Sequence, residues 1–232
     1  MEKANEKGFF AEHGKKTARI VFNALLIAGA GTGVALVAMG MGFVMAASAF
    51  TIQSNLLCAI AAGVTLAREI AGKDSKDKAY IFLKGMTLTS ILLTFVVYGF
   101  VLKPHFSATT QGAPSGSLSN DLLHVVVPLM TLADFLVFEE KGCFKAWHPF
   151  GWAAFPVYYT GYTAIYKAFG GVYAFTEGVP AKFPYFFLDY ETYGLGRVGI
   201  WILLIAIGFI GFSYALVGLD SILAKIKRFK AK

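Results

Sequence analysis

Long apolar stretches constrain this chain more than any other feature of its sequence. A helix of about twenty apolar residues spans the ~30 Å hydrocarbon core of a bilayer, and unpaired backbone groups are so costly there that such a stretch forms a helix. Stretches of this kind recur six times, at residues 20–41, 49–68, 79–101, 119–138, 150–172 and 198–219. We therefore predict an all-α polytopic membrane protein, a six-transmembrane-helix bundle that forms a single membrane domain over residues 1–232.

The composition supports the same class. Of the residues, 56% are hydrophobic and 15% are charged, and the mean hydropathy is +0.61. An ordinary soluble domain has about 45–50% apolar and about 25% charged residues. The predicted helices use most of the chain, so we expect no soluble domain beside them.

The first apolar stretch has one alternative interpretation, a secretory signal peptide. Positive charges precede it, and Ala47-Ser48-Ala49 has the small residues of a cleavage site. The stretch is longer than the apolar region of a signal peptide, which has about 7–15 residues. We therefore expect an uncleaved first span, with cleavage as the alternative.

The basic residues indicate how the helices are oriented. The formal net charge is +7, but Lys and Arg lie in tails and short loops rather than on one polar face, so we expect no nucleic acid partner. With the N-terminus inside, sixteen basic residues fall in the inner segments and three in the outer segments. Cytoplasmic segments carry such an excess. Both termini are therefore predicted to be cytoplasmic.

The glycines and cysteines give no sign of a cofactor or metal site. Gly29-Ala30-Gly31-Thr32-Gly33 resembles a phosphate loop only superficially, because no strand precedes it and no Lys-Ser or Lys-Thr follows it. Small residues at this spacing allow transmembrane helices to pack closely. Cys58 and Cys143 are predicted at different levels of the membrane, so we expect no disulfide between them. We also expect no cofactor and no bound metal.

Four ionisable residues are predicted within the spans, where their cost makes them candidates for function. Lys84 and Asp134 carry opposite charges at similar depths, roughly 7–9 Å from the inner boundary at 1.5 Å per residue. We favour an ion pair between the third and fourth spans, with a proton relay as the alternative. Lys167 lies near the outer interface, where its ammonium can reach water or Glu177. Alternatively, it binds a substrate carboxylate.

The fourth ionisable residue, His124, is matched by a hydroxyl at a similar depth. Counted from Arg68 and Glu139 at the inner boundary, Thr51 and His124 lie at ~26 and ~23 Å. The second and fourth spans, which carry them, run in the same direction, so both residues fall in the outer half of the bundle. A hydroxyl and an imidazole can act as nucleophile and general base in acyl transfer.

Pro128 affects the predicted surroundings of His124. Because proline has no N–H for the carbonyl four residues earlier, it tends to kink the helix and leave a polar niche there. Asn55 lies one turn after the hydroxyl, and Asn120 and Asp121 lie about one turn before the imidazole. A structural interpretation stays open, since Thr in such helices usually bonds its own backbone and a lone His often makes only an interhelical contact.

Three short segments of the sequence occur in a characteristic order. They are Phe50-Thr51-Ile52-Gln53-Ser54-Asn55-Leu56-Leu57, His124-Val125-Val126-Val127-Pro128-Leu129 and Tyr185-Phe186-Phe187-Leu188-Asp189. Over about residues 18–220, they resemble the androgen-induced-gene and androgen-dependent TFPI-regulating protein family, and the first segment is most similar to its microbial members. Those proteins are transmembrane threonine hydrolases of fatty acid esters of hydroxy fatty acids. The resemblance implies Thr51 as the catalytic threonine and His124 as the catalytic histidine.

The chain departs from this pattern in one place. The run from Lys167 to Asp189 is longer than the compact segment expected from the family, which places Val179 to Pro184 in an insertion. An altered outer loop can change the pocket or its entrance without changing the dyad.

The expected function is hydrolysis of a lipid ester near the outer leaflet, through an acyl-threonine intermediate. Membrane lipid and the ester substrate are the expected partners. If an acid orients the imidazole, the candidates are Asp121, Asp189 and Glu191. The candidates for stabilising the oxyanion are Asn55, Asn120, Gln53 and the backbone amides near the start of the second span. The candidates for substrate contacts are Lys167, Tyr185 and Pro128.

The alternative from another class is a non-catalytic protein that binds lipid or a small solute, or a transporter. The sequence has no clear inverted repeat, which is a common feature of transporters. A polar path through the whole bundle would favour transport. A closed inner half with an outer cavity that reaches Thr51 and His124 would favour hydrolysis.

Overall fold

The computed structural model describes residues 2–73, 76–104, 117–176 and 179–230, and most of them are helical. In chain order the helices are α1 (Glu2–Met41), α2 (Phe43–Ala47), α3 (Phe50–Ile70), α4 (Lys78–Val97), the π-helix η1 (Tyr98–Leu102), α6 (Leu118–Asp121), the π-helix η2 (Leu122–Val126), α7 (Val127–Phe138), α8 (His148–Trp152), α9 (Ala154–Ala168), the 3-10 helix η3 (Phe186–Leu188) and α10 (Tyr190–Lys230). The strands β1 (Ala174–Thr176) and β2 (Val179–Ala181) form an antiparallel hairpin. Apart from this hairpin, the described part of the chain has the predicted all-α class.

Five helical segments are long and apolar enough to cross a membrane. In the described part of the chain they are His13–Met41, Phe50–Ile70, Lys78–Leu102, Leu118–Phe138 and Tyr190–Phe229. They overlap five of the six predicted stretches, and such a set of helices is typical of an integral membrane protein.

The remaining predicted span, residues 150–172, is divided in the structure. α8 ends at Trp152, and α9 has 15 residues and ends at Ala168. Neither helix alone has the ~20 residues of a membrane span. Pro156 accounts for the break, because it lacks the N–H that would pair with the carbonyl of Trp152. The single continuous helix predicted here is therefore wrong.

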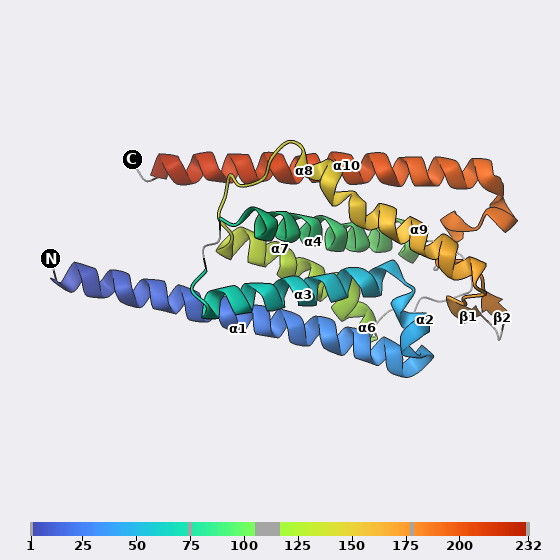
Figure 1. Ribbon diagram of the computed structural model, residues 1–232, viewed down its shortest axis with the longest axis horizontal. Coiled ribbons are helices and arrows are strands. Elements are labelled where there is room, and N and C mark those ends of the chain that lie inside the picture. The colour runs from blue at the N-terminus through green and yellow to red at the C-terminus, as the bar shows by residue number, and fades with distance from the viewer. Residues whose placement is uncertain (1, 74–75, 105–116, 177–178, 231–232) are drawn as a thin grey trace.

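The helices α1, α3, α4 and α7 pack side by side, whereas α10 lies along one edge of the bundle and contacts α4, α8 and η3 (Figure 1). The main apolar core lies between the four packed helices. Its buried members are Leu26, Ala30, Cys58, Ala62, Leu88, Ile91, Leu92, Val127 and Phe135, with Leu216 from α10. Because α10 lies at this edge, only 17% of its most apolar 18-residue stretch is buried inside the protein.

Glycine in α1 allows the approach of the segment that carries His124. A Cβ atom added to Gly33 would lie 2.7 Å from Cδ2 of Leu123 in η2, which is shorter than a van der Waals contact between carbon atoms. The small residues of the first span therefore permit close helix packing, as the sequence predicts.

The turn between α1 and α3 determines where Thr51 lies. Gly42 has a φ of 85°, a left-handed conformation that favours glycine, and it ends α1. The short α2 then reverses the chain, and α3 begins at Phe50. The first N–H groups of a helix have no partner within it. Those of Phe50 and Thr51 are therefore available to groups that face the start of α3.

Both ends of the chain lie at the same end of the bundle (Figure 1). Buried charges join the helices there. Lys84 pairs with Asp134, and it lies 3.2 Å from Glu139. Arg19 lies 2.8 Å from both Glu69 and Glu139. The structure thus brings Lys84 and Asp134 together, and further charges from α1 and α3 surround them.

Candidate functional site

Thr51 and His124 meet at the end of the bundle opposite the buried charges. The Thr51 Oγ1 atom lies 3.3 Å from His124 Nε2. Thr51 lies in the first turn of α3, and His124 lies in η2. Thr51 is 9% exposed, so its hydroxyl is largely shielded from solvent. This distance is slightly longer than the ~2.6–3.2 Å reach of a general base, as is common for catalytic hydrogen bonds before a substrate binds.

The other nitrogen of the imidazole faces a backbone carbonyl. His124 Nδ1 lies 3.1 Å from the carbonyl oxygen of Asn120. Because that oxygen can only accept a hydrogen bond, the contact favours the tautomer in which Nδ1 carries the proton. The Nε2 atom then has a free lone pair directed at the Thr51 hydroxyl. This is the protonation state that a general base needs.

Tyr98 holds the imidazole from its face. The two rings are stacked with their centroids 4.0 Å apart and an interplanar angle of 25°. The Tyr98 hydroxyl accepts a 2.8 Å hydrogen bond from Nδ2 of Asn120. Asn120 therefore joins both the ring and its stacking partner, which limits rotation of the imidazole.

Pro128 shapes the helix that carries His124. The carbonyl of His124 is the group that loses its usual amide partner to this proline. The chain forms the π-helical η2 just before Pro128, rather than a regular α-helix. Pro128 is buried and is not among the residues that line the cavity described below. It thus affects the backbone around His124, and its predicted substrate contact stays a prediction.

Asn55 fixes the separation between α3 and η2. Its side-chain Nδ2 donates to the carbonyl of Thr51 at 2.8 Å and to that of Leu123 at 3.1 Å. Gln53 Nε2 donates to the carbonyl of Ala47 at 3.0 Å. The amide protons of Asn55 are both used in these bonds, so it is a positioning residue rather than the predicted oxyanion donor.

Tyr185 lies against the start of α3. Its phenol interacts with the hydroxyls of Thr51 and Tyr159 and with the backbone of Phe50 and Thr51. Burial raises the pKa of the Tyr185 phenol, although these contacts partly oppose the effect. The hydroxyl therefore keeps its proton at neutral pH. A proton donor thus lies near the Thr51 hydroxyl at the start of α3, where the helix dipole is positive.

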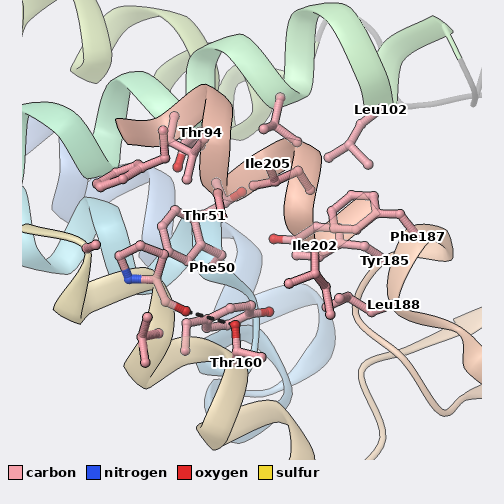
Figure 2. Close-up of a pocket in the computed structure, with 18 of the residues that line it drawn as sticks. Phe50, Thr51, Thr94, Leu102, Thr160, Tyr185, Phe187, Leu188, Ile202 and Ile205 are labelled. Atoms are coloured by element: carbon pink, nitrogen blue, oxygen red, sulfur yellow. Dashed lines mark hydrogen bonds between the residues drawn. The ribbon is translucent and has the colours of Figure 1, made fainter. Parts of the chain in front are cut away.

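An apolar cavity of about 190 Å³ reaches Thr51. Figure 2 shows Phe50 and Thr51 of α3 opposite Tyr185, Phe187 and Leu188, which precede α10. The remaining walls come from α4 and η1 (Leu93, Thr94, Val97, Leu102), from the region of α9 (Ala153, Pro156, Val157, Tyr159, Thr160) and from α10 (Ile202, Ile205, Ala206, Phe209, Ile210). His124 is not among these described lining residues, so it lies behind Thr51 as seen from the cavity.

Several residues predicted for the site lie elsewhere. Glu191 pairs with Lys167 at 2.6 Å and with Lys182 at 3.2 Å. Asp189 accepts a hydrogen bond from the backbone of Thr192. Asp121 is exposed at the end of α6. Because the described partner of His124 Nδ1 is a backbone carbonyl, none of these three acids orients the imidazole.

Lys167 does not line the cavity. Its ammonium lies 2.8 Å from the Tyr190 hydroxyl and over the rings of Phe183 and Tyr190, in addition to its pair with Glu191. The predicted contact with a substrate carboxylate is therefore replaced by an internal tie between α9 and α10. Glu177, the other predicted partner, lies outside the described residues.

Sequence reasoning missed three residues. Tyr98 and Tyr159 lie near the pair of Thr51 and His124, and Arg19 lies among the buried charges around Lys84. Tyr98 stacks on His124, and Tyr159 donates from its hydroxyl to the carbonyl of Ser48 at 3.1 Å, which ties α9 to the turn before α3. Arg19 is assigned by the sequence to the basic N-terminal tail, but it is 8% exposed and paired with two acids. Its position four residues before Asn23, at the start of an apolar stretch, is the only signal of burial in the sequence.

Comparison with known proteins leaves the family of the chain open. No family model, curated protein or solved structure matches it.

Proposed function

We propose that this protein is a membrane-embedded hydrolase of lipid esters, with Thr51 as nucleophile and His124 as general base. The observation that carries the proposal is the 3.3 Å contact between Thr51 Oγ1 and His124 Nε2, at the wall of an apolar cavity. The motifs that resemble the family of transmembrane threonine hydrolases support the same assignment. The substrates of that family are fatty acyl esters, which suit an apolar cavity.

In the first step, Thr51 Oγ1 attacks the ester carbonyl carbon while its proton moves to His124 Nε2. The carbonyl of Asn120, which accepts from Nδ1, stabilises the imidazolium that forms. The tetrahedral intermediate then breaks its bond to the alcohol oxygen. That oxygen takes the proton from Nε2 and leaves as the alcohol, and the acyl group remains on Thr51.

Tyr185 and the first amides of α3 are the groups that can stabilise the oxyanion. The Tyr185 phenol interacts with the backbone of Phe50 and Thr51 and with the Thr51 hydroxyl. A substrate carbonyl oxygen that displaces the phenol slightly would receive hydrogen bonds from the phenol and from one of these N–H groups. Donors placed where charge develops contribute strongly to acyl transfer.

In the second step, water attacks the acyl-threonine carbonyl and gives its proton to His124 Nε2. The bond to Thr51 Oγ1 breaks, the oxygen recovers the proton, and the fatty acid is released. The same imidazole therefore acts as base and acid in both steps. An apolar cavity suits the acyl chain, because its walls offer contact without competing polar groups.

We propose a topology of six membrane crossings with both termini in the cytoplasm. The five long helices would supply five crossings, and α8 and α9 together would supply the sixth. Two observations support this topology: both chain ends lie at one end of the bundle (Figure 1), and the basic residues are concentrated in the segments at that end.

The alternative function is transport or simple binding of lipid or a small solute. Transport needs access from both sides of the membrane. Against it, the end of the bundle that holds the chain termini is filled by the paired charges of Lys84, Asp134 and Glu139. The apolar core around Leu88 and Ile91 lies among the packed helices. Hydrolysis requires only the cavity at the opposite end, so we favour it.

The test uses purified protein in detergent with a fluorophosphonate probe and a chromogenic fatty acyl ester. We expect labelling and turnover by the wild type, and a loss of both in Thr51→Ala and His124→Ala, by at least ~10³-fold in turnover. Size-exclusion chromatography and the helical circular dichroism signal check that each variant is folded. Undiminished labelling and turnover in the folded variants would reject the dyad.

A further inference from the structure

The cavity beside Thr51 is open on one side, between α9 and α10. Of its described lining residues, four are exposed, and all four lie on these two helices: Val157, Thr160, Ile202 and Ala206. Lining residues on α3, α4 and η3 are buried or partly buried. The exposed residues therefore mark the two edges of a lateral opening.

The four exposed residues form two pairs, one on each helix, and each pair forms one edge of the opening. Val157 and Thr160 are three residues apart on α9, and Ile202 and Ala206 are four residues apart on α10, so each pair lies on a single helix face. Each edge exposes one branched apolar side chain: Val157 is 68% exposed and Ile202 is 40% exposed.

The single polar group at this edge is already satisfied. Thr160 Oγ1 donates to the carbonyl of Pro156 at 2.9 Å, and Figure 2 shows Thr160 on the α9 side of the cavity with this bond drawn. A hydroxyl bonded to its own helix presents its methyl group to the neighbours. The edge is therefore apolar although it contains a threonine.

The opening faces the lipid side of the bundle. α10 lies at the edge of the bundle (Figure 1), and Leu203, which follows Ile202 on this helix and does not line the cavity, is 59% exposed. Leu203 lies in the segment Tyr190–Phe229, which is long and apolar enough to cross a membrane. In a bilayer, lipid chains rather than water would therefore surround the opening.

We propose that the gap between α9 and α10 is a lateral portal through which one acyl chain of a membrane lipid enters the cavity. This inference rests on the proposed function, since it assigns the route by which the scissile ester reaches Thr51. The lining of α10 from Ile202 to Ile210 extends ~12 Å along the helix. The cavity thus takes the part of the chain next to the ester, and substrates are lipids with at least one extended acyl chain.

The test narrows the portal and compares two substrates. The variants Thr160→Trp and Ala206→Trp, alone and combined, place an indole at the two edges. Matched controls are Tyr158→Trp and Leu203→Trp, which lie on the same helices, are exposed, and do not line the cavity. Activity is measured with a palmitoyl ester embedded in phosphatidylcholine vesicles and with a water-soluble butyryl ester of the same chromophore.

We expect the portal variants to lower the ratio of palmitoyl-ester turnover to butyryl-ester turnover by roughly tenfold or more, because the short soluble ester does not need the portal. The controls should resemble the wild type with both esters. Equal rates for portal variants and controls would reject the portal. Equal losses with both esters would also reject it, because the substitutions would then act on the dyad rather than on chain entry.

A binding measurement separates this proposal from the hydrolase proposal. A fatty acid with a photoreactive diazirine near its terminus is incorporated into vesicles with the Thr51→Ala protein. We expect crosslinks to the deep lining residues Phe209 and Ile210, and a loss of these crosslinks in the portal variants on the same background. If wild-type protein shows no turnover but the crosslinks follow this pattern, the portal holds and the proposed hydrolysis fails. Crosslinks unaffected by the indoles would reject the portal whatever the activity.

Discussion

The hydroxyl of Thr51 lies 3.3 Å from Nε2 of His124, although 73 positions of the chain separate the two residues. Two further contacts stabilise this pair. Asn55 ties α3 to the carbonyl of Leu123 at 3.1 Å, and the carbonyl of Asn120 accepts from the far side of the imidazole. Backbone groups on both sides of the pair therefore hold its geometry, as the proposed roles of nucleophile and base require.

The identity of the nucleophile can be tested without changing the volume of the side chain. Thr51→Val removes the hydroxyl and retains the branched shape, and we expect it to abolish fluorophosphonate labelling. Thr51→Ser retains the hydroxyl and should keep labelling, with turnover within about tenfold of the wild type. Label remaining on Thr51→Val, located by peptide mass spectrometry, would place the nucleophile elsewhere.

The phenol of Tyr185 should stabilise the oxyanion. Tyr185→Phe removes the hydroxyl but keeps the ring, which is stacked on Phe187 with centroids 5.1 Å apart. We expect kcat for the butyryl ester to fall by about 10²-fold with little change in KM. Tyr158→Phe, at an exposed position outside the cavity, is the control. A rise in KM at constant kcat would instead show that Tyr185 only binds substrate.

The stability of the fold should fall in acid through Glu139. Burial opposes ionisation of this carboxyl, but Lys84 and Arg19 hold its pKa below the ordinary value. A pKa lowered by folding stabilises the protein above the unfolded value of ~4.3. That stabilisation is lost as the pH falls through the folded pKa. We expect the unfolding temperature in detergent to drop between about pH 5 and pH 3 for this reason.

Glu139→Gln isolates this contribution from that of the neighbouring Asp134. The variant leaves Lys84 and Arg19 with one carboxylate fewer, so we expect a loss of about 3 kcal/mol at neutral pH. Its unfolding temperature should also depend less on pH than that of the wild type. Parallel pH profiles for the two proteins would contradict the assignment.

Gly85 permits the contact between α4 and α8. A Cβ atom added there would overlap the ring of Trp152, which is fully buried. We expect Gly85→Ala to destabilise the protein by about 1–3 kcal/mol through overpacking. Thermal unfolding in detergent measures the change.

Gly63→Ala is the matched control, because nothing lies within 4 Å of an added Cβ atom at that position of α3. Alanine is the better helix former, so we expect this variant to be as stable as the wild type or more stable by about 0.5–1 kcal/mol. An equal loss of stability in both variants would show that the Trp152 contact is not the cause.

Apolar length and depth along each helix could be read from the sequence. Five long apolar helices form where the stretches predict them, since the hydrophobic effect and the need to pair backbone groups act on each stretch separately. The matching depths of Thr51 and His124, and of Lys84 and Asp134, follow from the fixed rise of a helix. The break of the predicted span 150–172 depends on Pro156, whose effect on a helix varies with its surroundings.

Only the tertiary structure decided which helices lie next to one another. Which helix faces meet depends on side-chain packing between segments far apart in the chain, such as Gly33 against Leu123. The same packing gives His124 a backbone carbonyl rather than an acid as its partner, and it buries Arg19 between Glu69 and Glu139. The sequence by itself thus determined the class of protein and the level of its polar groups, while packing decided which of those groups touch.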